Sequence, residues 1–204
     1  MILTNKYYRR KKMRIIAATQ NAHKLEEIYA IIKNFDMQLV SQAEAGFDID
    51  VEENGTTCEE NSFIKANAIC RLSGEPAIAD DTGLFVEAAD NEPGVNSARY
   101  SGVHGDDAAN RAKLLKRLEG VPFEKRTAYF LCVITLVYPD GKKIVAKGKC
   151  PGHIAMEERG ERGFGYDSIF IPQGTDKTFA ELSAEYKNSC SHRAKALQQL
   201  SQLL

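Results

Sequence analysis

The feature that most constrains the fold is a long pair of segments, "RTAYFLCVITLVYPDGKKIVAKGK" (Arg126–Lys149). The first segment is rich in β-branched and aromatic residues, and a Pro-Asp-Gly turn (139–141) separates it from the second, which predicts a long β-hairpin. Before this hairpin, strand-like apolar runs alternate with helix-like stretches. That order of elements predicts an α/β fold with a mixed sheet.

The first half of the chain shows this alternation. "MRIIAAT" (Met13–Thr19) is predicted to form a buried strand because it is apolar along its length. Thr57 and Glu60 form a T-x-x-E capping box, which places the start of a helix. The expected elements are, in order, a strand at Met13–Thr19, a helix near His23–Lys33, a strand near Met37–Ser41, a helix from Thr57 to about Leu72, and strands near Ala77–Ala79 and Leu84–Ala88.

In the second half the long hairpin interrupts this alternation, and we find no repeat or linker in the chain. "RGFGYDSIF" is predicted to be a glycine-rich turn that leads into a strand. The other expected elements are a loop at Pro93–Gly102, a helix capped by Asp106 or Asp107 that reaches Leu118, and a closing helix opened by Ser189 or Ser191 that reaches Leu204. We therefore expect one domain over residues 13–204.

Residues 1–12 form a basic extension ahead of that domain. The run "KYYRRKK" (Lys6–Lys12) has no apolar segment after it, so it is not a secretory signal. A disordered tail is the favoured interpretation, and a functional anchor is the alternative. Met13 could be an alternative start.

Composition excludes several classes of protein. The 204 residues carry a formal net charge of −1, whereas nucleic-acid binders usually carry a basic excess. No apolar run approaches the length that spans a bilayer. The five cysteines are scattered without metal-ligand spacing, so neither a zinc site nor a disulfide framework is indicated. We expect a cytoplasmic protein that binds neither nucleic acid nor membrane.

The stretch "AIADDTGLFVEA" (Ala77–Ala88) places two aspartates, Asp80 and Asp81, between two apolar runs. One interpretation is a turn in which Gly83 takes a positive φ. The other is a site for a divalent cation and an attacking water. "DTG" is also the core of aspartic protease motifs, which leaves a third possibility open.

The segment "TQNAHK" (Thr19–Lys24) joins the first strand to a helix, and backbone amides at a helix N-terminus form an anion site. Asn21 could simply cap that helix. Lys24 favours the anion site, because a cation in the first turn opposes the helix dipole unless an anion lies there.

A second cluster lies around the next helix. Asn61 and Lys65 are four residues apart and share a helix face, and the preceding loop supplies Glu52 and Glu53. Carboxylates and lysines from different segments are typical of a Mg²⁺–phosphate site. A solvated acidic loop is the alternative.

Two further patterns lie near the C-terminus. In "KNSCSHRAKA", Lys187, His192 and Arg193 gather around a helix start, where the dipole disfavours cations, so they either face an anion or polar ring or lie there by accident. In "GFGYD" (Gly163–Asp167), Phe164 lies between two glycines. Its ring could lie against a planar ligand or pack in the core.

These patterns occur together and in a fixed order: T-x-N-x-x-K, E-x-G-x-T-x-x-E-N-x-x-x-K-A, ADD[ST]G, PG-x-x-SARY, GFGYD and SHR. In this the chain resembles the Ham1/RdgB-like inosine triphosphate pyrophosphatases from near Met13 to its C-terminus. The departures are small. Thr82 replaces the commoner Ser, and Ser168 stands where many members have Pro.

The resemblance implies a homodimeric, Mg²⁺-dependent hydrolase. It would convert inosine, deoxyinosine and xanthosine triphosphates to the monophosphate and pyrophosphate. The implied fold is a long mixed β-sheet flanked by helices, with two lobes around a central cleft. The implied roles are phosphate binding by Thr19, Gln20, Asn21, Ala22, His23, Lys24 and Lys65; Mg²⁺ binding by Glu53 and Asp81, with Asp81 also the general base; substrate contact by Thr82; base stacking by Phe164 beside Gly165, Tyr166 and Asp167; and reading of the base edge by Lys187, His192 and Arg193.

Alternatives to this function remain. A related pyrophosphatase could prefer pyrimidine or methylated nucleotides. A binding module could sequester modified nucleotides without hydrolysis, although the carboxylates of Glu53 and Asp81 favour an enzyme. The aspartic protease interpretation is weaker, because capped helices on both sides of "DTG" do not suit that class of protein.

Overall fold

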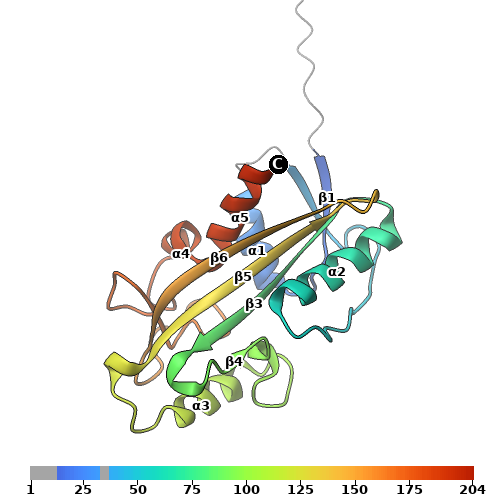
Figure 1. Ribbon diagram of the computed structural model, residues 1–204. Helices are drawn as coiled ribbons and strands as arrows, with labels where there is room; N and C mark the ends of the chain where they lie inside the picture. The colour runs from blue at the N-terminus through green and yellow to red at the C-terminus, as the bar shows by residue number, and fades with distance from the viewer. Residues whose placement is uncertain (1–12, 33–36) are drawn as a thin grey trace, which may run out of the picture.

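The computed structural model describes residues 13–32 and 37–204, and these form one mixed sheet with helices on both faces (Figure 1). The strand order is β2-β1-β3-β5-β6-β7, and β4 pairs with β3. β2, β1 and β3 are parallel neighbours, and the remaining pairs are antiparallel. The strands are β1 (Met13–Ala17), β2 (Met37–Ser41), β3 (Ala77–Val86), β4 (Pro93–Gly94), β5 (Thr127–Val137), β6 (Lys143–Ile154) and β7 (Phe170–Pro172).

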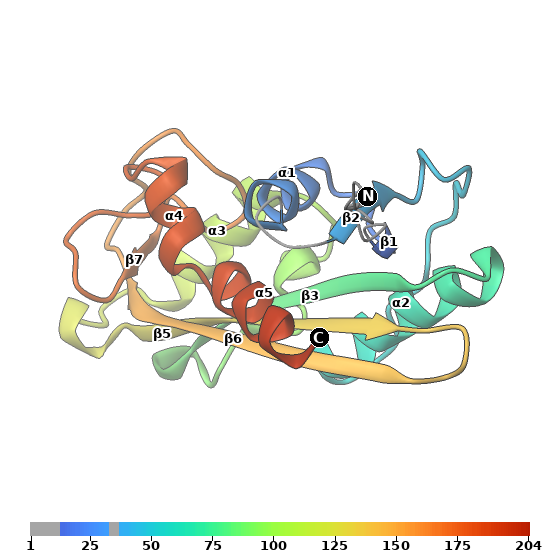
Figure 2. The same cartoon turned by 90° about the horizontal axis from the view of Figure 1, so that it is seen from above.

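The helices divide between the two faces of the sheet, as Figure 2 shows from above. α5 and α1 cover one face, α2 covers the other, and α3 lies near the far end of the long strands. The predicted long mixed sheet flanked by helices is therefore confirmed. The helices are α1 (Ala22–Ile32), α2 (Cys58–Ser73), α3 (Asp107–Arg117), α4 (Ala184–Cys190) and α5 (His192–Leu203), with single 3-10 turns η1 (Glu87–Ala89), η2 (Ser97–Arg99) and η3 (Phe123–Lys125).

The alternation of side chains along the strands creates the separate cores. Ile134 and Leu136 of β5 belong to the cluster that includes Leu197 and Leu200 of α5. On the α2 face, Ala77 and Ala79 pack instead with Ala66 and Ile69. Ile78, between them in β3, belongs to the α5 cluster, so one strand serves both cores because its successive residues point to opposite faces.

Close packing of α5 against β6 depends on a residue without a side chain. A Cβ atom at Gly148 would lie 1.9 Å from the carbonyl oxygen of His192 and 2.4 Å from the backbone nitrogen of Ala196. This contact sets the start of α5, and therefore His192 and Arg193, directly on the sheet.

The predicted ends of the elements are largely confirmed. Thr57 and Glu60 form both hydrogen bonds of the capping box. Ser191 caps α5, and Asp106 caps α3. The hairpin turn is also present, with Gly141 at a φ of 87°. These features are confirmed because each depends on residues within a few positions of one another.

The prediction of two short strands around the aspartates is wrong. β3 runs without interruption through Asp80 and Asp81, because each of its residues has a partner in β5. Gly83 lies within this strand and does not form a turn. A Cβ there would lie 2.6 Å from the carbonyl oxygen of Gly94, so glycine allows the approach of β4.

Other differences are local. α4 was not expected, although Ser183 caps it, and it places Lys187 in the last turn of a helix rather than at a helix start. The expected loop at Pro93–Gly102 contains β4 and η2. The expected extension over residues 1–12 and the predicted helix end at Lys33 lie outside the described residues.

Candidate active site

The two aspartates lie where the central strand has an open edge. β1 pairs with β3 only at Ala77 and Ile78, and β4 pairs only with Leu84 and Phe85. Within the described residues, the intervening edge of β3 has no strand partner. A cleft of about 480 Å³ opens at this edge.

The cleft gathers residues that the sequence analysis selected from distant segments. Ala22 and His23 do not line it; His23 instead stacks on Phe164, with ring centroids 5.2 Å apart. The selected residues that line the cleft are Thr19, Gln20, Asn21, Lys24, Glu53, Lys65, Asp81, Thr82, Phe164, Gly165, Tyr166, Asp167, Lys187, His192 and Arg193.

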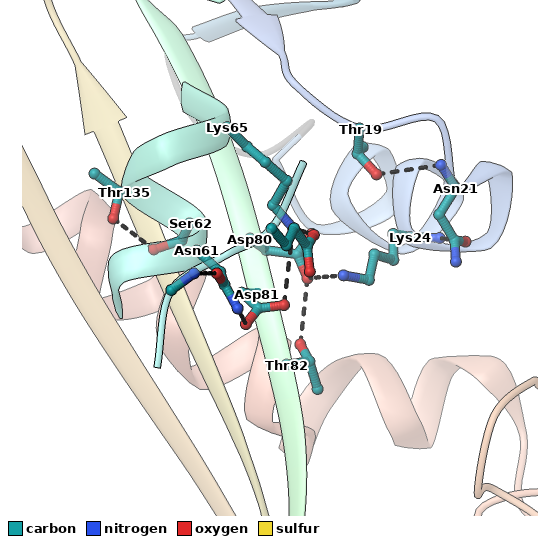
Figure 3. Close-up of polar contacts among 12 residues, drawn as sticks. Thr19, Asn21, Lys24, Asn61, Ser62, Lys65, Asp80, Asp81, Thr82 and Thr135 are labelled. Atoms are coloured by element: carbon teal, nitrogen blue, oxygen red, sulfur yellow. Dashed lines mark hydrogen bonds and ion pairs between the residues drawn. The ribbon is translucent and has the colours of Figure 1, made fainter. Parts of the chain in front are cut away.

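Asp81 points toward α2, as Figure 3 shows. Its carboxylate accepts a hydrogen bond from Asn61 Nδ2 at 3.4 Å and lies 3.8 Å from Lys65 Nζ. Burial raises the pKa of Asp81 above its usual value, and Lys65 and Lys24 offset only part of this rise. Asp81 is therefore a carboxylate with an increased affinity for a proton.

Asp80 points to the opposite face of the sheet and lies in a different environment. Its Oδ2 atom lies 2.8 Å from Arg193 Nη2 and 3.3 Å from Lys24 Nζ. Burial would raise the pKa of Asp80, but Lys24, Arg193 and Lys65 together hold it well below its usual value. Adjacent like charges are tolerated because the strand sends them to opposite faces and cations lie beside both: Lys24 is close to Asp80 and Lys65 is close to Asp81 (Figure 3).

Lys24 and the start of α1 also line the site. Asn21 caps the helix, since its Oδ1 atom accepts a hydrogen bond from the Lys24 backbone N–H at 3.0 Å. The Lys24 ammonium reaches back from the first turn to Asp80 (Figure 3). The anion expected beside this first-turn lysine is therefore present, and it is the Asp80 carboxylate of the protein itself.

Glu53 and Asp81 are the candidate ligands of Mg²⁺. Both approach the Lys65 ammonium, at 2.5 and 3.8 Å, so oxygens from two segments converge on one position. Across residues 13–32 and 37–204 no group of three or more His, Cys, Asp and Glu side chains could hold a metal ion. Mg²⁺ is commonly held by one or two carboxylates together with phosphate and water. The two carboxylates fit a Mg²⁺ of that kind.

Phe164 also lines the cleft. Lys187 Nζ lies 4.7 Å from the centre of its ring. The same ammonium lies 2.5 Å from Asp167 and 2.7 Å from Glu27. The ring therefore lies beside a buried network of alternating charges.

His192 and Arg193 are both buried. Burial, Arg193 and Lys187 lower the pKa of His192 well below its usual value, so its imidazole is neutral. Its Nδ1 atom has no partner among the described residues. The Arg193 guanidinium is ion-paired with Asp80 and Glu27, and a role in reading a base edge stays a prediction for it.

Sequence reasoning missed several polar residues of the site. Glu27 lies three positions after Lys24 on the same helix face, a spacing that could have indicated it. Arg99, whose Nη1 atom lies 3.9 Å from Glu53, belongs to the SARY motif, and Asp107 lines the cleft from the first turn of α3. Only the folded chain brings these residues to the carboxylates and to Phe164.

Comparison with known proteins identifies the family of this chain. The family described as "Ham1 family" matches residues 15–203. The chain belongs to the Ham1 family. It is 48% identical over 193 residues to a protein named dITP/XTP pyrophosphatase from Clostridium perfringens, a match that covers 92% of this chain and 95% of that protein. The protein of the same name from Bacillus subtilis is 45% identical over 189 residues, with 93% and 96% covered.

Solved structures of Ham1 proteins have the same fold. The Staphylococcus aureus Ham1 protein superposes with a TM-score of 0.83 at 41% identity, covering 93% of this chain and 97% of that chain. A Ham1 protein from Coxiella burnetii gives 0.84 at 39% identity, with 94% and 98% covered. Among the described residues of this Ham1 chain, no helix is both long and apolar enough to cross a membrane.

Proposed function

We propose that this Ham1 protein hydrolyses non-canonical purine nucleoside triphosphates, those of inosine, deoxyinosine and xanthosine, to the monophosphate and pyrophosphate. The observation that carries the proposal is that the carboxylates of Glu53 and Asp81 meet beside Lys65 in a cleft that Phe164 also lines. Relatives at up to 48% identity are named dITP/XTP pyrophosphatases. A nucleotide that spans this cleft would place its phosphates at the carboxylates and its base at the aromatic ring.

The reaction requires a water molecule to attack the α-phosphorus as the bond to the bridging oxygen breaks. Asp81 is suited to accept the proton of that water, because burial raises its pKa toward the range in which a carboxylate is an effective base. Lys65, and Lys24 with the amides at the start of α1, would hold the phosphate oxygens. When bound by Glu53 and Asp81, Mg²⁺ would supply neutralisation of the phosphate charge.

Recognition of the base would involve the aromatic ring that lines the cleft. Phe164 would stack on the purine, beside Gly165, Tyr166 and Asp167. The partnerless Nδ1 atom of the buried His192 suggests that a ligand atom completes its hydrogen bonding, since buried polar atoms are normally paired.

Turnover on a panel of nucleoside triphosphates, with and without Mg²⁺, tests this function. We expect pyrophosphate release from inosine and xanthosine triphosphates, little from ATP or GTP, and none after chelation of the metal. Faster release from pyrimidine or methylated nucleotides would favour the sister activity. Tight binding without release would favour a sequestering module.

We also propose a homodimer in the cytoplasm, as the family resemblance implies. Sedimentation equilibrium of the full chain tests the dimer: a mass twice that of the chain is expected, and a monomer at all concentrations would contradict it.

A further inference from the structure

Helix α3 holds both backbone polar groups of Gly165, the residue that follows Phe164. The Gly165 N–H donates to Asp107 Oδ2 at 2.7 Å, and the Gly165 carbonyl accepts from Arg111 Nη1 at 2.8 Å. Asp107 and Arg111 are four residues apart, so both side chains project from one face of the helix. In the loop between β6 and β7, the N–H and the carbonyl of Gly165 are thereby both hydrogen-bonded to α3.

A second layer of contacts holds Arg111. Its Nε atom donates to Glu158 Oε2 at 2.9 Å, and the Ser168 hydroxyl donates to the same oxygen at 3.0 Å. Many members of the family that the sequence resembles have proline in place of Ser168, and proline stiffens the backbone without any side-chain hydrogen bond. Here side-chain hydrogen bonds connect the two ends of the same loop.

The loop needs such support because its own backbone is permissive. Gly163 and Gly165 flank Phe164 with φ values of 77° and 61°, a region that glycine enters without steric cost. On the far side, the Tyr166 hydroxyl donates to the Ser97 carbonyl at 2.9 Å. The position of the Phe164 ring therefore depends on what holds Gly165, together with the ring's own contacts with His23 and Lys187.

We propose that Asp107 and Arg111 are positioning residues for base recognition: they fix the loop so that Phe164 presents its ring to the nucleobase. This inference rests on the proposed function. It assigns to α3, which supplies none of the predicted phosphate or metal ligands, a role in the affinity for the base and not in the chemical step.

Arg111→Ala is the first test, and Arg117→Ala is its matched control. Both remove a guanidinium from α3 that pairs with an acidic side chain, but Arg117 bonds Asp90, outside the loop. Base–aromatic stacking contributes enough binding energy for us to expect a KM for inosine triphosphate about tenfold higher in Arg111→Ala. We expect kcat to change by less than about threefold, and Arg117→Ala to match the wild type.

Product inhibition distinguishes binding of the base from binding of the phosphates. Inhibition by inosine monophosphate should weaken in parallel with KM in Arg111→Ala, whereas inhibition by pyrophosphate, which has no base, should stay within about twofold. Equal losses for both products, or none for either, would overturn the positioning role.

Asp107→Asn and Asp107→Ala provide the second test. The asparagine amide oxygen can still accept from the Gly165 N–H, so Asp107→Asn should restore most of the affinity that Asp107→Ala loses. If both variants lose it equally, the charge of Asp107 acts on the ligand itself and the proposal fails. Wild-type protein that releases no pyrophosphate from any purine triphosphate would instead refute the proposed function.

Discussion

Two arginine–aspartate pairs in this protein have the same length but opposite burial, which allows a quantitative prediction. Arg193 Nη2–Asp80 Oδ2 and Arg117 Nη2–Asp90 Oδ2 are both 2.8 Å. The side chains of the first pair are 1% and 0% exposed, and those of the second are 48% and 85% exposed. Distance is thus held constant. The pairs differ in their contact with water, and Arg193 and Asp80 also have second partners in Glu27 and Lys24.

We expect Arg193→Ala to lower the free energy of unfolding by about 3–5 kcal/mol, because it leaves the buried Asp80 carboxylate with Lys24 as its remaining close cation. Arg117→Ala should cost less than about 1 kcal/mol, since water solvates Asp90 once its partner is removed. Urea denaturation of the wild type and of both variants measures the difference directly.

A double variant separates loss of charge pairing from loss of packing. Arg193→Ala combined with Asp80→Asn removes the stranded carboxylate, so it should be less destabilised than the sum of the two single variants by about 1–3 kcal/mol. Strict additivity, or an Arg193→Ala variant as stable as Arg117→Ala, would refute the argument from burial. If Arg193→Ala were as stable as the wild type, Arg193 would have no structural role and would be free to bind the ligand.

Three other substitutions test the catalytic and local structural arguments. Asp81→Asn should lower kcat by at least about a hundredfold while circular dichroism shows an unchanged fold, because the change is nearly isosteric and removes the general base; more than a third of wild-type turnover would contradict this role. Gly148→Ala should destabilise the protein by about 3 kcal/mol or more in chemical denaturation, since its Cβ would lie 1.9 Å from the His192 carbonyl oxygen, and a loss below 1 kcal/mol would show that α5 can shift. Thr57→Ala removes the N-cap of α2 and should lower the free energy of unfolding by about 1 kcal/mol, whereas Thr57→Ser should retain most of it.

The sequence by itself determined the features that depend on near neighbours. The hairpin turn at Gly141, the cap of α2 at Thr57 and the cap of α5 at Ser191 each follow from residues a few positions apart. Most of the residues that the order of motifs selected also line the cleft, with Ala22 and His23 as the exceptions. Local chemistry is sufficient for the turn and the two caps because their hydrogen bonds close within one turn of the backbone.

Only the tertiary structure decided the surroundings of each of the two aspartates. The sequence indicated a break at "DDTG", but pairing with β5 keeps the strand intact and therefore sends Asp80 and Asp81 to opposite faces. The partner of Asp80 is Arg193, 113 residues later in the chain. A carboxylate's charge state depends on the water and the cations around it, and here distant segments supply the cations and exclude the water only after they have folded together.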